Sequence, residues 1–286
     1  MYIHLATDNS FYAIAPKPKS LSTTRCRIIG SMEKNWLHFF ELLWSMTEKE
    51  LRARYKYTIF GFLWLVVNPV LQMLVIGFVF TFFMKQPVQH YYYYLFIGLL
   101  VWNFFSLSLT KTTPSIVFER SLIKKAAFPR SVIPLSIIFS NLIHFFVAIL
   151  LFSAYMATQG AIVFVHFPYI FLGILLLLAT TVGLSLFASA VNVRYRDMNF
   201  FIQALLIIWF YGTPIIYSLT QAPQKLRWVW FFNPLTAITQ LFQYSFLPTD
   251  LPEPGLFMIN SAICIGILCI GILTFSRESK FFDDWI

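Results

Sequence analysis

The chain has 286 residues, of which 58% are hydrophobic and only 12% are charged, with a formal net charge of +9 and a mean hydropathy of +0.71. Soluble domains carry about 25% charged residues, so this composition excludes an ordinary soluble fold. The basic excess does not indicate nucleic-acid binding, because Lys and Arg lie in short segments that flank apolar runs, where they anchor the chain to lipid and set its topology. We therefore predict an all-α polytopic membrane protein.

The N-terminal segment is expected to stay attached and largely unstructured. It contains no continuous apolar run followed by a cleavage site, so we expect no removable signal peptide. We predict a flexible cytoplasmic tail over residues 1–30 and a single transmembrane domain over residues 31–286. Cys26, Cys264 and Cys269 are odd in number, and two lie in an apolar block, so no disulfide framework is indicated.

Residues 36–56 repeat apolar side chains at helical spacing, opposite a stripe of charged ones. Glu48 precedes Arg52 by four residues and Glu50 precedes Arg54 by four, which is the favourable order for pairs on a helix surface. This pattern predicts an interfacial amphipathic helix with its aromatic side toward the membrane. The helix serves either as an anchor alone or as an anchor whose polar face also contacts a cytoplasmic partner.

Six uncharged segments are candidate transmembrane helices, since about 20 apolar residues cross the hydrocarbon core as a helix. They are residues 58–84, 94–110, 131–157, 168–191, 198–219 and 256–276. Six spans place both termini on one side of the membrane, and 18 of the 21 basic residues then lie on that side. The positive-inside rule makes that side the cytoplasm, and we expect the bacterial cytoplasmic (inner) membrane.

Residues 228–249 form a further uncharged stretch, with Asn233-Pro234 near its start and Gln240 and Gln243 further along. As a seventh span it would move the C-terminus outside and lower the number of basic residues inside to 16. Irregular backbone at membrane depth is tolerated only where protein or a water-filled cavity surrounds it. We predict a broken, re-entrant hairpin on the external side, between spans five and six.

The connection between spans two and three, residues 111–130, is longer than a simple turn requires. Pro114 and Phe128-Pro129 bound it, which predicts a short helix over residues 115–127. Its apolar residues are expected to face the membrane domain; they are Ile116, Leu122, Ile123 and Ala126. Its charged residues are expected to face outward; they are Glu119, Arg120, Lys124 and Lys125, followed by Arg130. Positive-inside anchoring explains the lysines, and docking to a partner explains the length.

Several kinds of chemistry are missing from the chain. It contains no G-x-x-x-x-G-K-[ST] motif, so it has no P-loop for nucleotide phosphates. The histidines lack metal-ligand spacing, and we predict neither a metal site nor catalytic residues. His144 lies inside a span, as either a neutral packing residue or a functional group. No acidic residue lies in the apolar blocks, which argues against a self-powered secondary carrier.

Several motifs resemble the permease subunits of ABC exporters for polysaccharides and polyol phosphates, of the O-antigen, capsule and teichoic-acid type. They are R-x-R-Y-K-Y-T-I-F-G-F-L-W-L-V-V-N-P (52–69), Y-L-F-I-G-L-L-V-W (94–102), L-I-K-K-A-A-F-P-R-S-V-I-P-L (122–135), R-Y-R-D (194–197) and Y-G-T-P-I-I-Y (211–217), followed by Asn233-Pro234. Each motif is degenerate, but their order and spacing are specific, and the resemblance covers about residues 36–276.

The resemblance implies a six-span permease that forms a homodimer and pairs with separate ATPase subunits, which would bind ATP and Mg. It implies that the amphipathic helix and the 111–130 connection form the ATPase docking surface, and that the hairpin between spans five and six shapes an external gate. The coupling residues would be Glu48, Arg52, Glu119, Arg120, Lys124, Lys125, Phe128, Pro129 and Arg130.

A polysaccharide cargo suits the aromatic content of 19%, because aromatic rings give sugar faces flat apolar contact without a fixed hydrogen-bond pattern. The candidates to line or gate a pore are Tyr91, Tyr94, Trp102, Phe104, Phe105, Tyr211, Tyr217, Asn233 and Pro234. Interfacial belts and lipid-facing bulk also explain such rings. Arg52, Arg54 and Lys56 are candidates to attract the phosphates of a lipid-linked polysaccharide, or they anchor to bulk lipid headgroups.

Two other functions remain open on the sequence. One is an ABC-type exporter of drugs or small lipids, and the other is a channel or secondary carrier. Co-purification with a P-loop ATPase separates the channel or carrier from both exporters.

Overall fold

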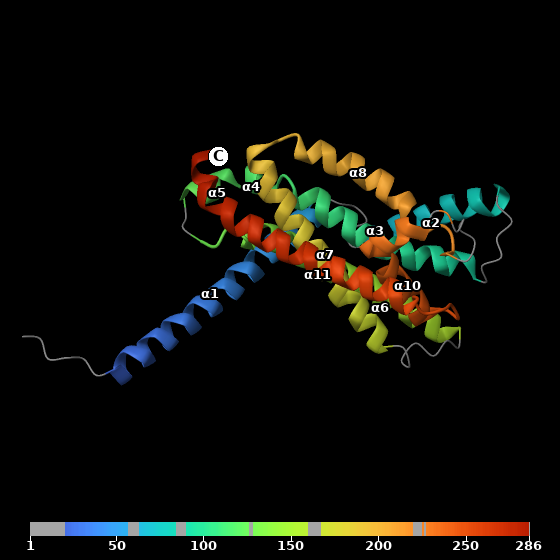
Figure 1. Cartoon of the computed structure of the whole chain (residues 1–286), viewed down its shortest axis with the longest axis horizontal. Helices are drawn as coiled ribbons and strands as arrows, with labels where there is room; N and C mark the ends of the chain where they lie inside the picture. The colour runs from blue at the N-terminus through green and yellow to red at the C-terminus, as the bar shows by residue number, and fades with distance from the viewer. Residues whose placement is uncertain are drawn as a thin grey trace, which may run out of the picture. The chain divides into compact units, whose positions relative to one another are not determined.

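The computed structural model describes residues 21–56, 63–83, 90–125, 128–159, 167–219, 225 and 227–285. These residues form helices joined by turns and short irregular segments, and contain no strand (Figure 1). The chain divides into two compact units, Met1–Glu41 and Leu42–Ile286. Helix α1 (Leu21–Tyr55) begins in the first unit, so residues 21–30 of the predicted tail are helical. Residues 1–20 lie outside the described residues.

Four helices of the second unit are long and apolar enough to cross a membrane. They are α3 (Tyr91–Thr112), α6 (Val132–Thr158), α7 (Phe167–Arg194) and α11 (Pro254–Glu278). They match four of the six predicted segments. Residues 131–193 contain no Lys, Arg, Asp or Glu, and this stretch holds the two helices α6 and α7, which match the predicted segments 131–157 and 168–191.

Helices α2 (Trp64–Phe83) and α8 (Met198–Gly212) correspond to the other two predicted segments and have shorter apolar stretches. Part of the predicted segment 58–84 lies outside the described residues. Helix α8 ends before residue 219 because Thr213 adopts an extended conformation. The chain then continues as irregular backbone.

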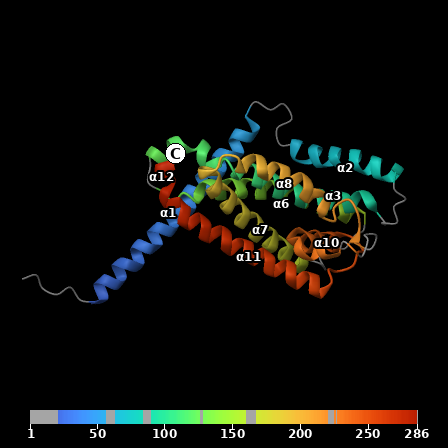
Figure 2. The same cartoon turned by 45° about the horizontal axis from the view of Figure 1, so that its top comes forward.

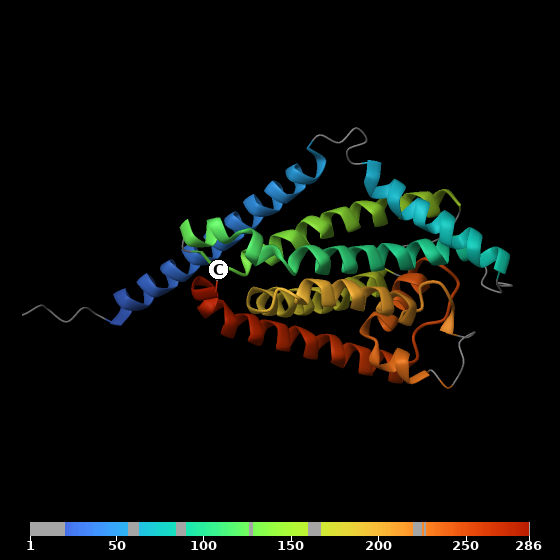
Figure 3. The ribbon, with the colours of Figure 1, turned by 90° about the horizontal axis from the view of Figure 1, so that it is seen from above.

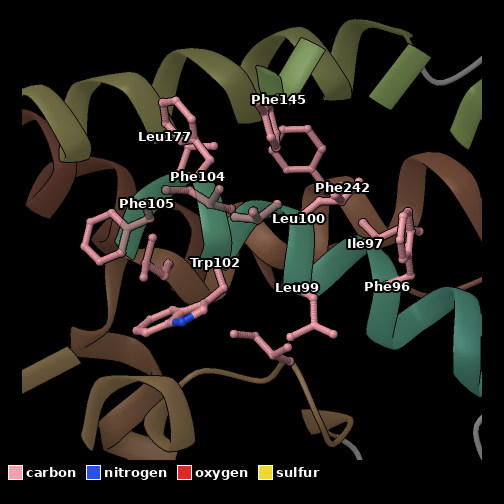
Figure 4. Close-up of a cluster of buried hydrophobic side chains, with 14 of the residues drawn as sticks. Phe96, Ile97, Leu99, Leu100, Trp102, Phe104, Phe105, Phe145, Leu177 and Phe242 are labelled. Atoms are coloured by element: carbon pink, nitrogen blue, oxygen red, sulfur yellow. The ribbon is translucent and has the colours of Figure 1, made fainter. Parts of the chain in front are cut away.

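Helix α3 is the centre of the helical unit. It packs against α2, α6, α7 and α10 (Pro234–Phe246), and Figure 3 shows it between α6 and α7 with α11 beyond α7. The core around it is aromatic (Figure 4): the rings of Phe104 and Phe145 are 5.2 Å apart, and those of Phe145 and Phe242 are 5.6 Å apart. Aromatic pairs at these separations add stability beyond the apolar area that they bury.

Helices α7 and α11 cross at two glycines. A Cβ atom added at Gly271 would lie 2.0 Å from the backbone oxygen of Gly183, and one added at Gly183 would lie 2.6 Å from that of Ile267. The two backbones can approach so closely only because both residues lack a side chain. Small residues at such contacts are typical of helix packing in membranes, where close van der Waals contact replaces the hydrophobic drive.

The uncharged stretch 228–249 is broken into two helices, α9 (Arg227–Phe232) and α10. The break falls at Asn233, whose side chain accepts a hydrogen bond from the backbone N–H of Leu235, with Pro234 in the first turn of α10. Asparagine as an N-cap followed by proline is a strong helix-start signal. The Asn-Pro pair therefore explains why this stretch does not form one continuous helix.

The predicted helix over residues 115–127 is also divided. Helices α4 (Ser115–Phe118) and α5 (Arg120–Lys125) flank Glu119, whose backbone leaves the helical conformation. Ile116 and Ile123 are buried, as their spacing predicts, whereas Ala126 lies outside the described residues. At the C-terminus, a 3₁₀ turn η5 (Ser279–Phe281) and helix α12 (Phe282–Trp285) follow α11; Figure 2 shows α12 beside the 111–130 connection.

Candidate functional site

Residues 42–56 of α1 together with α4 and α5 form one surface, which we call the α1–α5 surface. Leu43, Met46 and Thr47 of α1 are buried, so this part of α1 packs into the second unit. Lys49 Nζ lies 2.6 Å from Glu119 Oε1 and ties α1 to the turn between α4 and α5. The two segments predicted separately as docking elements are therefore joined by an ion pair.

The charged candidates on this surface are mostly exposed. Arg120, Lys124 and Lys125 face outward, as their pattern predicts. Arg52 forms an ion pair with Glu48 along the helix, which is the predicted pairing four residues apart. An exposed pair of this kind contributes little to stability, and a partner's acidic side chain can replace Glu48 at small cost.

Phe118, at the end of α4, was not among the predicted coupling residues. Its side chain is 78% exposed, directly before the charged pair Glu119-Arg120. Large aromatic side chains that bury themselves in a partner account for much of the energy of protein interfaces. Its sequence signal is an aromatic residue in a charged connection bounded by prolines.

The three other coupling candidates lie at the far end of the connection, beside the C-terminus. Arg130 donates a hydrogen bond to the backbone oxygen of Ser279, and its guanidinium lies 5.9 Å from the centre of the Phe282 ring. Arg130 therefore holds the C-terminal segment. Phe128 and Pro129 line a cavity of about 1020 Å³ between this loop, α7 and α11.

The three predicted substrate-entrance cations are separated in the structure. Arg52 faces the polar stripe of α1, and Lys56 is exposed in the turn after α1. Arg54 alone turns inward, where its Nη1 lies 2.6 Å from His144 Nδ1 and its Nη2 donates to Asn141 Oδ1. Since guanidinium only donates, His144 Nδ1 is the acceptor and carries no proton. His144 is therefore a hydrogen-bond partner of Arg54, one of the predicted substrate-entrance residues.

Arg54, Lys111, Asn141 and His144 line a cavity of about 410 Å³ among α2, α3 and α6, which we call the cationic cavity. Asn141 is itself fixed, because its Nδ2 donates to Ser108 Oγ at 2.9 Å. This chain of hydrogen bonds orients Arg54. Two cations within one cavity can hold an anion such as a phosphate group.

A row of amides leads away from this cavity. Asn103 Nδ2 donates to Gln72 Oε1 at 3.0 Å, and Gln72 Nε2 lies 3.4 Å from Asn68 Oδ1. Asn68 and Asn103 line the cationic cavity, while Gln72 and Asn103 line a second cavity of about 320 Å³ between α2, α3 and α8. We call this second cavity the aromatic groove, because Trp102, Phe210 and Tyr211 also line it.

The six predicted pore residues that lie on α3 and α8 fall into two groups. Trp102 and Tyr211 both lie in the aromatic groove, and Tyr211 is 63% exposed. Figure 4 shows Trp102 on the side of α3 opposite Phe145. The rings of Tyr91, Tyr94, Phe104 and Phe105 are at most 7% exposed and belong to the core. Trp102 is 8% exposed and its ring packs on those of Phe105 and Phe210, so among these rings Tyr211 alone has a large accessible surface. A pore-lining role for the other five stays a prediction.

Tyr91 and Tyr94 instead hold the irregular backbone that follows α8. Tyr91 Oη donates to the backbone oxygen of Ile216 at 3.0 Å, and Tyr94 Oη lies 3.2 Å from that of Pro214 and 3.1 Å from that of Tyr217. These bonds satisfy carbonyl groups that a helix would otherwise satisfy. The 213–217 motif is thus fixed in a non-helical conformation.

Asn233 ties the same motif to α10. Its Oδ1 accepts from Trp209 Nε1 at 2.8 Å and from the N–H of Leu235 at 3.1 Å, and its Nδ2 donates to Gly212 O at 3.0 Å and Thr213 Oγ1 at 2.9 Å. Pro234 is buried beside it, and Tyr217 Oη accepts a hydrogen bond from Trp230 Nε1 at 3.2 Å. The predicted gate residues therefore form the joint between α8 and α10.

Among the described residues, no group of three or more His, Cys, Asp or Glu side chains could hold a metal ion. The α1–α5 surface and the cationic cavity are the two places where predicted site residues with charged side chains come together.

Comparison with known proteins places these features in a family. The family model described as "ABC-2 type transporter" matches residues 41–247. The O-antigen export system permease protein RfbA of Klebsiella pneumoniae is 33% identical over 211 residues, which cover 72% of this chain and 80% of that protein. The protein of the same name from Myxococcus xanthus is 31% identical over 246 residues, covering 85% and 95%. The chain is a multi-pass membrane protein that belongs to the ABC-2 type transporter family.

Proposed function

We propose that this chain is the permease subunit of an ATP-driven exporter that moves a polysaccharide, linked to a lipid, across the bacterial cytoplasmic membrane. The observation that carries the proposal is the similarity, over most of its length, to proteins named O-antigen export permeases. The aromatic groove supports a glycan cargo, because the exposed ring of Tyr211 offers a stacking face beside the amides of Gln72 and Asn103.

In the proposed topology, α2, α3, α6, α7, α8 and α11 are six spans, and both termini are cytoplasmic. Residues 36–56 lie along the membrane surface, and α9 and α10 form a re-entrant hairpin on the external side. The hydrogen bonds of the 213–217 backbone support this hairpin, since irregular backbone survives at membrane depth only when its polar groups are satisfied within the protein.

The proposed transporter is a homodimer with two separate ATPase subunits, which bind ATP and Mg. Helices α2 and α8 flank the aromatic groove and expose large apolar side chains, among them Phe78 and Ile208. We place the second copy against these two helices, so that the grooves of both copies face one another and form the pore.

The ATPase docks on the α1–α5 surface in this proposal. Phe118 supplies an apolar anchor, and Arg120, Lys124 and Lys125 supply a basic rim. The Lys49–Glu119 ion pair makes α1 and α4–α5 move together when the ATPase closes. The energy for the change between closed and open pore comes from the partner, because only a partner that contacts the two states differently can shift their populations.

The test compares cells that make the polymer with the same cells lacking this chain. Loss of this chain should leave synthesis intact but retain the polymer on the cytoplasmic side, measured as glycan that a lectin reaches only after the cells are permeabilised. Surface polymer at the normal level in these cells would contradict the proposal. The triple variant Lys124→Gln, Lys125→Gln, Arg120→Gln should retain membrane insertion and reduce export, because it removes the basic rim alone.

A further inference from the structure

Two cavities adjoin along the seam between α2, α3 and α6. The cationic cavity is one of them, and the other has a volume of about 260 Å³. The second cavity is apolar and is lined among others by Val70, Met73, Phe96 and Leu151. Ala148 lines both cavities, so they meet at this residue. We call the two together the seam groove.

The seam groove is polar at one end and apolar along the rest. On α6, Asn141 and His144 line the cationic part, Ala148 lies at the junction, and Leu151 and Tyr155 line the apolar part. These residues follow one another at spacings of three and four, so they form one face of the helix. From Asn141 to Tyr155 this face is about 21 Å long at 1.5 Å per residue, against about 30 Å for the hydrocarbon core.

The polar end is chemically suited to a phosphate group. Within the described chain, its lining contains the cations Arg54 and Lys111 and no carboxylate. Glu50 shares a neighbouring cavity with Lys111 and does not line the cationic cavity. Two cations held near each other at the membrane surface favour an anion between them, and phosphate accepts hydrogen bonds from both guanidinium and ammonium.

We propose that the seam groove binds the lipid anchor of the cargo, with its phosphate between Arg54 and Lys111 and one apolar chain along α6. This inference rests on the proposed function, in which the cargo is linked to a lipid. The amides explain why the occupant is the anchor and not a bulk phospholipid: Asn103 lines both the cationic cavity and the aromatic groove. A phosphate bound at Arg54 therefore carries its attached glycan beside Trp102 and Tyr211.

The test measures binding of single-chain lipid probes to the purified complex of permease and ATPase in detergent. Geranylgeranyl phosphate is the probe, geranylgeraniol is the same chain without phosphate, and phosphatidylglycerol is the bulk-lipid competitor. We expect Lys111→Gln to weaken the binding of geranylgeranyl phosphate about ten-fold and to leave that of geranylgeraniol unchanged, since one charge-assisted contact is worth about a factor of ten or more. Ala148→Phe, which fills the junction, should weaken both probes.

The control is Arg196→Gln, which removes one positive charge from an exposed site in the connection between α7 and α8 and should change neither affinity. If Ala148→Phe does not fold, Leu151→Ala replaces it, because it removes apolar contact surface from the groove and should also weaken the binding of both probes. Equal weakening by Arg196→Gln, or full displacement of the probe by an equal concentration of phosphatidylglycerol, would overturn the proposal.

Transport separates this inference from the proposed function. If Lys111→Gln binds and exports normally while export still requires ATP and the ATPase, the seam groove is not the anchor site and the exporter assignment stands. If the wild-type complex exports nothing, the proposed function itself fails. If Lys111→Gln reduces export but retains ATP hydrolysis, this supports the binding of the lipid anchor in the seam groove.

Discussion

Replacing Asn233 by leucine should destabilise the joint between α8 and α10. Its side chain makes four hydrogen bonds, to Trp209, Leu235, Gly212 and Thr213, and leucine makes none of them. At a net value of about 1 kcal/mol each the loss is about 4 kcal/mol, and at the value of about 0.6 kcal/mol found within membranes it is about 2.4 kcal/mol. We expect a loss of free energy of unfolding between these two figures.

Thermal unfolding of the purified protein in detergent measures this effect. Each kcal/mol shifts the melting temperature by roughly 2–4 °C in chains of 150–250 residues, so Asn233→Leu should lower it by about 5–15 °C. Asn199→Leu is the matched control, because the side chain of Asn199, at the start of α8, makes no hydrogen bond within the described residues. Equal melting temperatures for the two variants would refute the role assigned to Asn233.

Three further predictions follow from contacts elsewhere in the chain. Lys49→Glu should lower ATP-driven export by at most about five-fold, since exposed ion pairs contribute about 0.2–1 kcal/mol. Adding Glu119→Lys should restore export, and a double variant that exports no better than the single one would count against the pair. Gly271→Leu should lower the melting temperature by forcing α11 off α7, whereas Gly266→Leu, where nothing lies within 4 Å of an added Cβ, should not; similar curves would exclude the close crossing. Phe118→Asp should weaken co-purification of the ATPase about ten-fold or more, as expected for an aromatic anchor, and unchanged recovery would remove Phe118 from the interface.

Much of the helical arrangement could be predicted from charge-free length and from Asn-Pro. The stretch 131–193 predicts two helices because lipid-crossing helices need only apolar length, and Asn233-Pro234 predicts a break because capping and a fixed φ act locally. The end of α8 at Gly212 also has a local signal, which the predicted segment 198–219 overran: Thr213 precedes Pro214, and a proline disfavours helical backbone at the residue before it. The irregular backbone beyond it is held from elsewhere in the chain. Tyr91 and Tyr94 of α3 bond to the backbone oxygens of residues 214, 216 and 217, and Asn233, the N-cap of α10, donates to Gly212 O and Thr213 Oγ1.

The candidate site was predictable only where a residue's role depends on its own segment. Arg52 and Arg54 are two residues apart, so they point to different sides of α1, but only the fold reveals that Arg54 meets Asn141 and His144. The partner of Lys49 lies 70 residues away along the chain, beyond the reach of any local pattern. The same limit separates Tyr211, which is 63% exposed in the aromatic groove, from Phe105 in the core.

The central claim is that this chain forms the path across the membrane and a separate ATPase supplies the energy. The most direct test reconstitutes the permease in vesicles, with or without its ATPase, and follows the appearance of a lipid-linked glycan on the opposite leaflet. We predict transfer only when the ATPase, ATP and Mg are all present. Transfer of the glycan by the permease alone, without nucleotide, would contradict the account.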